Sequence, residues 1–553
     1  MDKKYDRKFF ETRRKELDTP FEEIKSDLQE LAQHFYPRSV RFLANEVNKT
    51  NRKKNSKIID STPIIALRNF SSGMMSGATS PAQNWFKFKI RNYNMENDYE
   101  VKSWCAAVEK ITRDTLYSSK AYDKLPIVYK QLGVFAFSTL ALESDYDDLF
   151  TCKVLPMGSY RYAKNFKGEV DTLVREYSET AKNLVEQFGE ENVSEAVKTM
   201  NEKNPQQYVE VIHFVMPNPN YDTTKKWARN KKFISVYYEK SSKDGKFLSE
   251  SGFDKFPYIV FEAETNGEDV YPSDCPAINA LPDLKQLNTM IKEYAKAVKK
   301  IVSPPLKGPA KFKNRTISTL PESYVEDVEG NDAGVRPIHE VNPRILELAQ
   351  EITSMKSTIK EHFYNDLFAM ILNTAERGRT ATEVNELKEE KMVLVSPLLE
   401  QIHSGLKKFF EWILEELIEV DVLPEPPEQI QGGEFEIEFV STLAQAQKVQ
   451  KIAAMERFST FTLNLANALD PMLRFKVNGC KLIDDYGDFA NIDPSQINPT
   501  EYVEQLRAQQ QQKQEQQEQL AAIQQGTEMI KNIGGVDAIG ANLAARLGEG
   551  GGK

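Results

Sequence analysis

Residues 281–305 read LPDLKQLNTMIKEYAKAVKKIVSPP, which is the pattern of an amphipathic helix with a defined end. Pro282 and Asp283 form a helix start signal, and two prolines at 304–305 stop the helix because proline has no N–H to donate. The apolar residues recur at steps of three and four: Leu284, Leu287, Ile291, Ala295, Val298 and Ile301. The sequence therefore predicts a helix over residues 283–302.

A long insert rich in proline and glycine separates this helix from a second one. Asn342 and Pro343 signal the second helix, which carries an apolar stripe from Ile345 to Phe363 and is predicted over residues 342–371. Helices that pack as neighbours are usually joined by about 2–8 residues. Residues 303–341 are thus predicted to form a small lobe at the end of a two-helix stalk, a shape that suits assembly or passage better than catalysis.

The segments after the stalk are also predicted to be largely helical. A polar loop at 372–382 contains Arg377-Gly378-Arg379, and a third helix follows to about Val420, with a kink expected at Pro397. Residues 434–440 alternate between polar and apolar, which predicts a half-buried strand, and a helical block follows at 443–468. The Gln-rich tail after residue 500 is either a solvated helix or disordered.

The first half of the chain is predicted to mix helices and strands. Residues 1–57 have a polar helical pattern and end in a basic run at 51–57, interpreted as a solvated loop. Strand-like segments lie at 135–143, 208–216 and 233–238, the last followed by a hairpin turn at 243–246. Helices are expected around Trp104 and over residues 181–188. The predicted fold class is mainly α with α+β parts.

Composition limits the class of protein. The chain has 553 residues, 40% hydrophobic and 28% charged, which is enough for several domains, and its net charge of −10 argues against a general nucleic-acid coat. No stretch is long and apolar enough to span a membrane, and the charged N-terminus does not resemble a signal peptide. We expect an intracellular protein without a membrane partner. Its widely spaced cysteines indicate free thiols: Cys105, Cys152, Cys275 and Cys480.

The usual catalytic signatures are absent from the sequence. It contains no phosphate loop, zinc-protease motif, nucleophile elbow or dinucleotide fingerprint. The five histidines are scattered, and the acidic pairs at 147–148 and 484–485 would bind a metal only if distant ligands converged. The small residues at 71–81 suggest an anion cradle less well than a closely packed helix that stops at Pro81. No catalytic residue, metal or cofactor is therefore predicted.

Several motifs in a fixed order resemble those of the portal, or head-to-tail connector, proteins of short-tailed phages. The clearest are NFSSGMMSG at 69–77, SGF at 251–253, ALPDLK at 280–285, TATEV at 380–384 and LAQAQ at 443–447. Together they span roughly residues 65 to 460. The resemblance implies a ring, twelvefold in the mature virion, at one capsid vertex, through which the genome is packaged, retained and ejected.

The resemblance also implies a division of the chain into the parts of a portal-type fold. Residues 1–282 would form the wing, 283–302 and 342–371 the stem helices, and 303–341 the clip between them. Residues 372–382 would form the tunnel loop, 383–440 a spine helix and wing strand, and 441–500 the crown. Residues 501–553 would be a tail, either a barrel helix or disordered.

The partners implied are those of a passive conduit that is not an enzyme. They are double-stranded DNA in the channel, the terminase large subunit, tail adaptor or nozzle proteins, the major capsid protein and scaffolding protein, with assembly in the host cytoplasm. The DNA-channel candidates are Lys292, Lys296, Lys299, Lys300, Arg377 and Arg379. The stem lysines fit helix solubility or contacts between subunits equally well.

The start of the clip carries a second basic group, whose members have no nearby acid in the sequence: Lys307, Lys311, Lys313 and Arg315. These clip docking candidates fit DNA, the packaging motor or the tail adaptor. The alternatives to a portal are another virion assembly protein, such as an adaptor or internal scaffold, and a DNA-processing enzyme. A nuclease would need a cluster of carboxylates around a metal, which the sequence does not indicate.

Overall fold

The computed structural model describes residues 5–37, 40–42, 58–90, 99–145, 147–222, 230–242, 245–303, 306–307, 336–337, 344–372, 381–427, 435–440, 442–468, 470, 472, 476–490, 492, 496–498 and 500–532. They divide into two compact units. The first comprises Met1–Lys89, Ala107–Glu425 and Phe435–Gln447, and the second Ile90–Ala106, Pro426–Glu434 and Lys448–Lys553. The mixture of helices and strands agrees with the predicted fold class.

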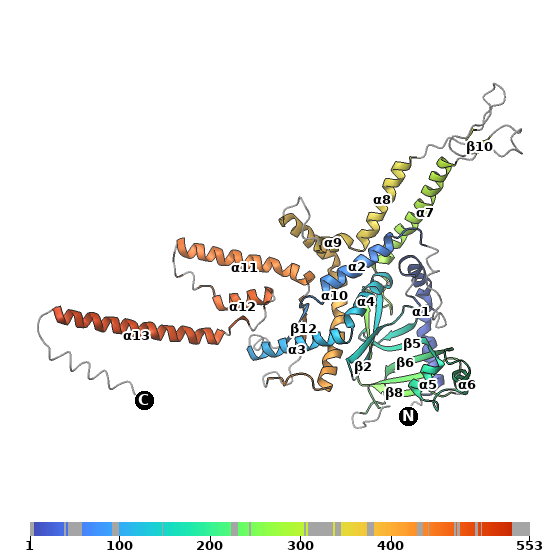
Figure 1. The fold of residues 1–553 in the computed structure, drawn as a ribbon, viewed down its shortest axis with the longest axis horizontal. Coiled ribbons are helices and arrows are strands. Elements are labelled where there is room, and N and C mark those ends of the chain that lie inside the picture. The colour runs from blue at the N-terminus through green and yellow to red at the C-terminus, as the bar shows by residue number, and fades with distance from the viewer. Residues whose placement is uncertain are drawn as a thin grey trace, which may run out of the picture. The chain divides into compact units, whose positions relative to one another are not determined.

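A five-stranded antiparallel sheet forms much of the first unit (Figure 1). Its strands follow the chain in order: β4 (Tyr160–Lys164), β5 (Val170–Thr180), β6 (Tyr208–Pro217), β7 (Phe233–Glu239) and β8 (Ser249–Phe253). The predicted strands at 208–216 and 233–238 are confirmed as β6 and β7. The hairpin between β7 and β8 is confirmed by the pairing of Tyr237 with Ser249, although residues 243–244 of its turn lie outside the described residues. The edges of this sheet are β4 and β8.

Helices cover both faces of this sheet. On one face, α1 (Arg7–Phe35) buries Phe10 and Leu17 against Val174 and Phe214. On the other, α5 (Ala181–Phe188) and α6 (Glu195–Lys203) form a core with β6. The helix predicted at 181–188 is therefore confirmed, and the helical prediction for residues 1–57 is confirmed over Arg7–Phe35. The basic run at 51–57 lies outside the described residues.

A three-stranded sheet, in the order β3 (Leu149–Val154), β2 (Phe137–Asp145) and β9 (Tyr258–Glu262), forms the rest of the core. The helix α4 (Ala121–Phe135) enters β2 through Ala136, whose φ is +66°. The strand therefore begins two residues later than predicted. The strand predicted at 434–440 is confirmed as β12 (Phe435–Phe439), which pairs with β1 (Phe86–Ile90), a strand that the sequence did not predict.

The first of the two helices predicted to form the stalk, α7, begins earlier than predicted, since it spans Pro276–Val302. Pro276 occupies the first turn after an extended Cys275, a position where proline costs no hydrogen bond, and Pro282 lies inside the helix. Buried Ala277 and Ala280 continue the apolar stripe toward the N-terminus. Pro276 and Pro282 are both compatible with the start of a helix. The burial of Ala277 and Ala280 shows that the helix begins at Pro276.

The second helix predicted for the stalk, over residues 342–371, is two helices rather than one. It consists of α8 (Ile345–His362) and α9 (Asn365–Leu372), separated at Tyr364, whose φ is +54°. Phe363 is fully buried, with its ring 5.7 Å from that of Phe35 and 6.2 Å from that of Phe70. These contacts anchor the chain where its direction changes, and they involve residues too distant in sequence for a periodic pattern to reveal.

The remaining helices agree closely with the predictions. The long third helix is α10 (Ala381–Glu419), which contains Pro397. The predicted block at 443–468 is α11 (Thr442–Ala468), and α3 (Tyr99–Ser118) contains Trp104. The second unit also contains α12 (Gly479–Ala490) and α13 (Thr500–Asn532), so the Gln-rich segment is helical as far as residue 532.

Candidate functional site

The helices α7 and α8 lie side by side as a helical pair (Figure 1). Burial falls steadily along the pair. Near its base Leu284, Leu287 and Ile359 are buried, whereas Ile291 and Val298 are half-buried and Ile301, Val302 and Leu346 at the far end are exposed. The apolar stripes that predicted both helices are therefore buried within one chain only near the base.

The four stem lysines lie on the exposed surface of α7. Lys296 Nζ lies 2.7 Å from Glu293 Oε1, and this hydrogen bond and the charge of Lys296 hold the pKa of Glu293 below its usual value. Lys292, Lys299 and Lys300 form no ion pair within the described part of the chain. Three of the four candidates are thus available to a charged partner.

The insert closes at its root with a short antiparallel ladder. In this ladder β10 (Leu306–Lys307) pairs with β11 (Arg336–Pro337), and Lys307 is directly opposite Arg336. The backbone therefore brings two basic residues together, although Arg336 was not among the sequence candidates because only pairing reveals its neighbour. The candidates Lys311, Lys313, Arg315, Arg377 and Arg379 lie outside the described residues.

Two polar contacts fasten α8 at the base of the pair. His362 Nε2 lies 2.9 Å from Asp283 Oδ2 on α7, and Lys356 Nζ lies 2.6 Å from Asp60 Oδ2, just before α2 (Thr62–Ala78). Burial alone would raise the pKa of Asp60, but hydrogen bonds from Lys356 and Thr62 outweigh it and leave that pKa below its usual value. The base is therefore attached to the body of the first unit by charge as well as by packing.

The small residues at 71–81 pack closely, as predicted. A Cβ added at Gly73 would lie 2.1 Å from Phe368 Cγ of α9, and one at Gly133 would lie 2.9 Å from Phe70. Ser71 Oγ donates a hydrogen bond to the Pro126 carbonyl at 2.7 Å. This stretch is a contact surface for α4 and α9 in which the small side chains are required by space.

The described residues contain no group of three or more His, Cys, Asp or Glu side chains able to hold a metal. The four cysteines, all within the described residues, form no disulfide bond with one another. His213 is a buried structural residue, with Nδ1 2.7 Å from the Tyr258 hydroxyl and its ring stacked 3.8 Å from that of Tyr237. Burial, with the nearby charge of Arg175, keeps the pKa of His213 well below its usual value, so its imidazole is neutral.

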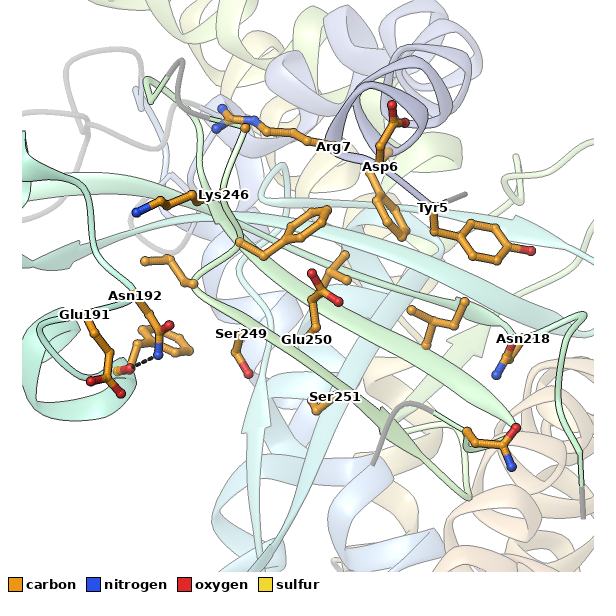
Figure 2. A pocket seen from close by; sticks show the side chains of 18 of the residues that line it. Tyr5, Asp6, Arg7, Glu191, Asn192, Asn218, Lys246, Ser249, Glu250 and Ser251 are labelled. Carbon is orange, nitrogen blue, oxygen red and sulfur yellow. Dashed lines mark hydrogen bonds between the residues drawn. The ribbon is translucent and has the colours of Figure 1, made fainter. Parts of the chain in front are cut away.

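A hollow lies along the β8 edge of the five-stranded sheet (Figure 2). It measures about 1260 Å³, and Figure 2 shows the start of α1, the segment after α5 and β8 around it. Half-buried apolar side chains and polar side chains line it together, and five of the described residues contribute charge: Asp6, Arg7, Glu191, Lys246 and Glu250. The lining has no pairing of a nucleophile with a base and no cluster of metal ligands, so it resembles a docking surface more than an active site.

No helix in the described ranges combines the length and apolar character that a membrane crossing requires.

Comparison with known proteins gives consistent matches over most of the chain. A sequence model of the family described as "Bacteriophage head to tail connecting protein" matches residues 7–497. The chain is 36% identical over 488 residues to the portal protein of Salmonella phage epsilon15, covering 88% of this chain and 87% of the relative. It is 33% identical over 541 residues to the probable portal protein of Bordetella phage BPP-1, covering 97% of both.

Proposed function

The chain belongs to the family of bacteriophage head-to-tail connecting proteins, and from this membership we propose how its parts serve the portal of a phage. Its function is that of a portal protein, a structural component of the virion capsid and not an enzyme. We propose a closed ring of copies at one capsid vertex, twelve in the mature virion, that conducts double-stranded DNA during packaging and ejection.

The observation that carries the ring is the incomplete burial of the α7–α8 pair. A helix whose apolar stripe is left uncovered needs another surface to bury it. Copies placed around a closed axis would supply that surface from the neighbouring pair, and a repeated heterologous contact closes into a ring when its rotation permits. In this arrangement α7 and α8 are the stem, residues 303–341 the clip and residues 372–382 the tunnel loop.

The rest of the chain is assigned to the outer parts of the same ring. We assign residues 1–282 to the wing, 383–440 to the spine helix with its wing strand, and 441–500 to the crown, followed by the Gln-rich tail. The clip would dock the terminase and later the tail adaptor, with Lys307 and Arg336 at its root. The wing would contact scaffolding protein and the major capsid protein during assembly in the host cytoplasm.

Charge explains why DNA would pass without being held. Each phosphate that a protein neutralises adds salt-dependent affinity, which opposes movement. Twelve copies at −10 carry a net charge of 12 × −10, or −120, which on balance repels DNA. Each basic residue that faces the channel would then be repeated around the ring, as one of a few separate rings of positive charge. Lys292, Lys296, Lys299 and Lys300 are the described candidates, of which Lys296 is paired with Glu293, and Arg377 and Arg379 belong to the tunnel loop.

Negative-stain electron microscopy of the purified protein tests the ring directly. End-on averages should show a central hole with one symmetry, and a closed oligomer without a hole would refute the conduit. A variant lacking residues 303–341 should still form rings but fail to bind terminase. Intact terminase binding by this variant would instead show that the clip assignment is wrong.

Replacing Lys292, Lys299 and Lys300 by Gln separates their two possible roles. Glutamine keeps the length and polarity of each side chain but removes its charge. If these lysines face DNA, rings should form normally while packaging or retention of the genome changes. If ring formation itself fails, the lysines contact the neighbouring subunit, and the channel assignment is refuted.

A further inference from the structure

A rigid hairpin on the β4 edge displays one fully exposed aromatic side chain. Phe166 is 94% exposed at the turn between β4 and β5. The backbone N–H groups of Lys167 and Glu169 donate to Asn165 Oδ1 at 2.8 and 3.0 Å, and Gly168 adopts the left-handed conformation with φ +81°. The turn is therefore organised by its own hydrogen bonds, and none of them depends on where the Phe166 ring lies.

This exposure has no structural benefit within one chain. An exposed phenylalanine leaves a large apolar surface in water, whereas a rigid aromatic anchor that enters a partner pocket loses little conformational entropy on binding. Aromatic residues of this kind carry much of the binding energy at protein interfaces. Phe166 is thus placed as an anchor for another surface.

The hollow in Figure 2 has the matching chemistry and lies at the opposite edge of the same sheet. Its lining includes the half-buried apolar side chains of Phe188, Ile234 and Phe247, whereas its other apolar residues, Phe10, Val236 and Leu248, belong to the buried core. Lys167 follows Phe166 on the hairpin, and the hollow is lined, among the described residues, by three acids, Asp6, Glu191 and Glu250, against two bases, Arg7 and Lys246. Apolar surface and opposite charge therefore correspond between the two edges.

We propose that Phe166 of one copy inserts into the hollow along β8 of the neighbouring copy, so that the five-stranded sheets form a second belt of contacts around the ring. A projection on one edge and a recess on the other make a heterologous interface, which is the type that repeats around a ring. If Phe166 instead bound a capsid or scaffolding protein, the recess that receives it would lie on that protein and not on this chain. The inference rests on the ring proposed above and adds a residue-level contact to it.

Photo-cross-linking of assembled, full-length protein tests this contact. p-Benzoylphenylalanine in place of Phe166 should link, on irradiation, to peptides of another copy that contain residues 187–192 or 245–251. The same group in place of Tyr208 is the matched control, because Tyr208 is also exposed, at 41%, but lies at the opposite end of this sheet. The Tyr208 site should not label those peptides.

Two sets of variants test the energetics. Phe166→Ala should weaken each contact between neighbours by about 30-fold, seen by mass photometry as ring dissociation at higher protein concentration. It should not unfold the chain, since the side chain is exposed, whereas Phe166→Leu should retain most of the affinity. Lys167→Glu should also weaken the ring, and Glu191→Lys in the same chain should restore part of the loss.

The outcomes distinguish this contact from the ring itself. The contact would be refuted, and the ring left in place, if rings form but the cross-linker at position 166 labels only its own hairpin. Labelling of a capsid protein or of another face of the neighbouring copy would have the same meaning. Unchanged ring stability in Phe166→Ala would do the same. Wild-type protein that never forms rings would refute the proposed ring together with the contact.

Discussion

A methyl group added at Gly73 is a stringent test of the packing at the base of the stem. In Gly73→Ala the new Cβ would lie 2.1 Å from Phe368 Cγ, 2.3 Å from Cδ1 and 2.6 Å from Cβ. Ordinary contact begins at 3.4 Å, so the ring must move by 3.4 − 2.1, or 1.3 Å. Phe368 is only 2% exposed and its ring lies 6.0 Å from that of Phe70, so it has no open space to enter.

The expected cost follows from two opposing effects. Overpacking a close-packed core usually costs about 1–3 kcal/mol. Replacing glycine by alanine inside a helix returns about 0.5–1 kcal/mol, because alanine loses less backbone entropy. Gly73→Ala should therefore reduce the free energy of unfolding of the first unit by about 1–2 kcal/mol, measured by denaturant titration with tryptophan fluorescence.

Two further variants separate the clash from the general effect of alanine. Gly479→Ala, in the second unit, is a control for an added methyl group without a clash, because a Cβ there has no neighbour within 4 Å, and it should leave the unfolding of the first unit within about 0.5 kcal/mol of wild type. Phe368→Leu should relieve the clash, so the double variant with Gly73→Ala should be more stable than the sum of the single effects predicts. Wild-type stability in Gly73→Ala, or strict additivity in the double variant, would refute this account of the α2–α9 contact.

Three further changes have defined outcomes. Because burial keeps the pKa of His213 well below 6.5, the unfolded chain binds the extra proton as pH falls below about 6.5, and stability should decline by up to about 1.4 kcal/mol per pH unit; His213→Gln should flatten this slope in denaturant titrations between pH 5 and 8. Gly405→Ala, inside α10, places a Cβ 2.4 Å from Phe261 Cδ1, so by the same reasoning it should cost about 1–2 kcal/mol in the same assay, and no loss would show that α10 can shift on β9. Lys356→Met removes the ion pair that lowers the pKa of Asp60, so acid titration by NMR should show that pKa higher than in wild type, and an unchanged value would contradict the pairing.

Much of the fold could be predicted from the sequence because the long elements carry strong periodic patterns. The helices α10 and α11 and the strands β6, β7 and β12 were found within about two residues. The errors lie where distant residues decide. Tyr364 interrupts a stripe that continues on both sides of it, because Phe363 is held by Phe35 and Phe70.

The candidate surfaces were predicted less completely for the same reason. The stem lysines were recognised because helical periodicity separates an apolar stripe from a polar surface. Arg336 was missed because only strand pairing brings it opposite Lys307. Phe166 was missed as well, although Asn165 and Gly168 are typical turn residues. Phenylalanine is usually buried, so nothing in the sequence indicated an exposed one here.

The difference between the predicted stripe and the observed burial is itself informative. A stripe of apolar residues predicts a buried surface, and α7 maintains that stripe to Val302. Within one chain its burial ends at Asn288, and on α8 only Ile359 is fully buried. The sequence thus encodes more apolar surface along the stem than a single copy covers. We infer that this excess is the part of the sequence that specifies assembly, and that the packed base, with Gly73 and Phe363, fixes the direction in which each stem meets its neighbours.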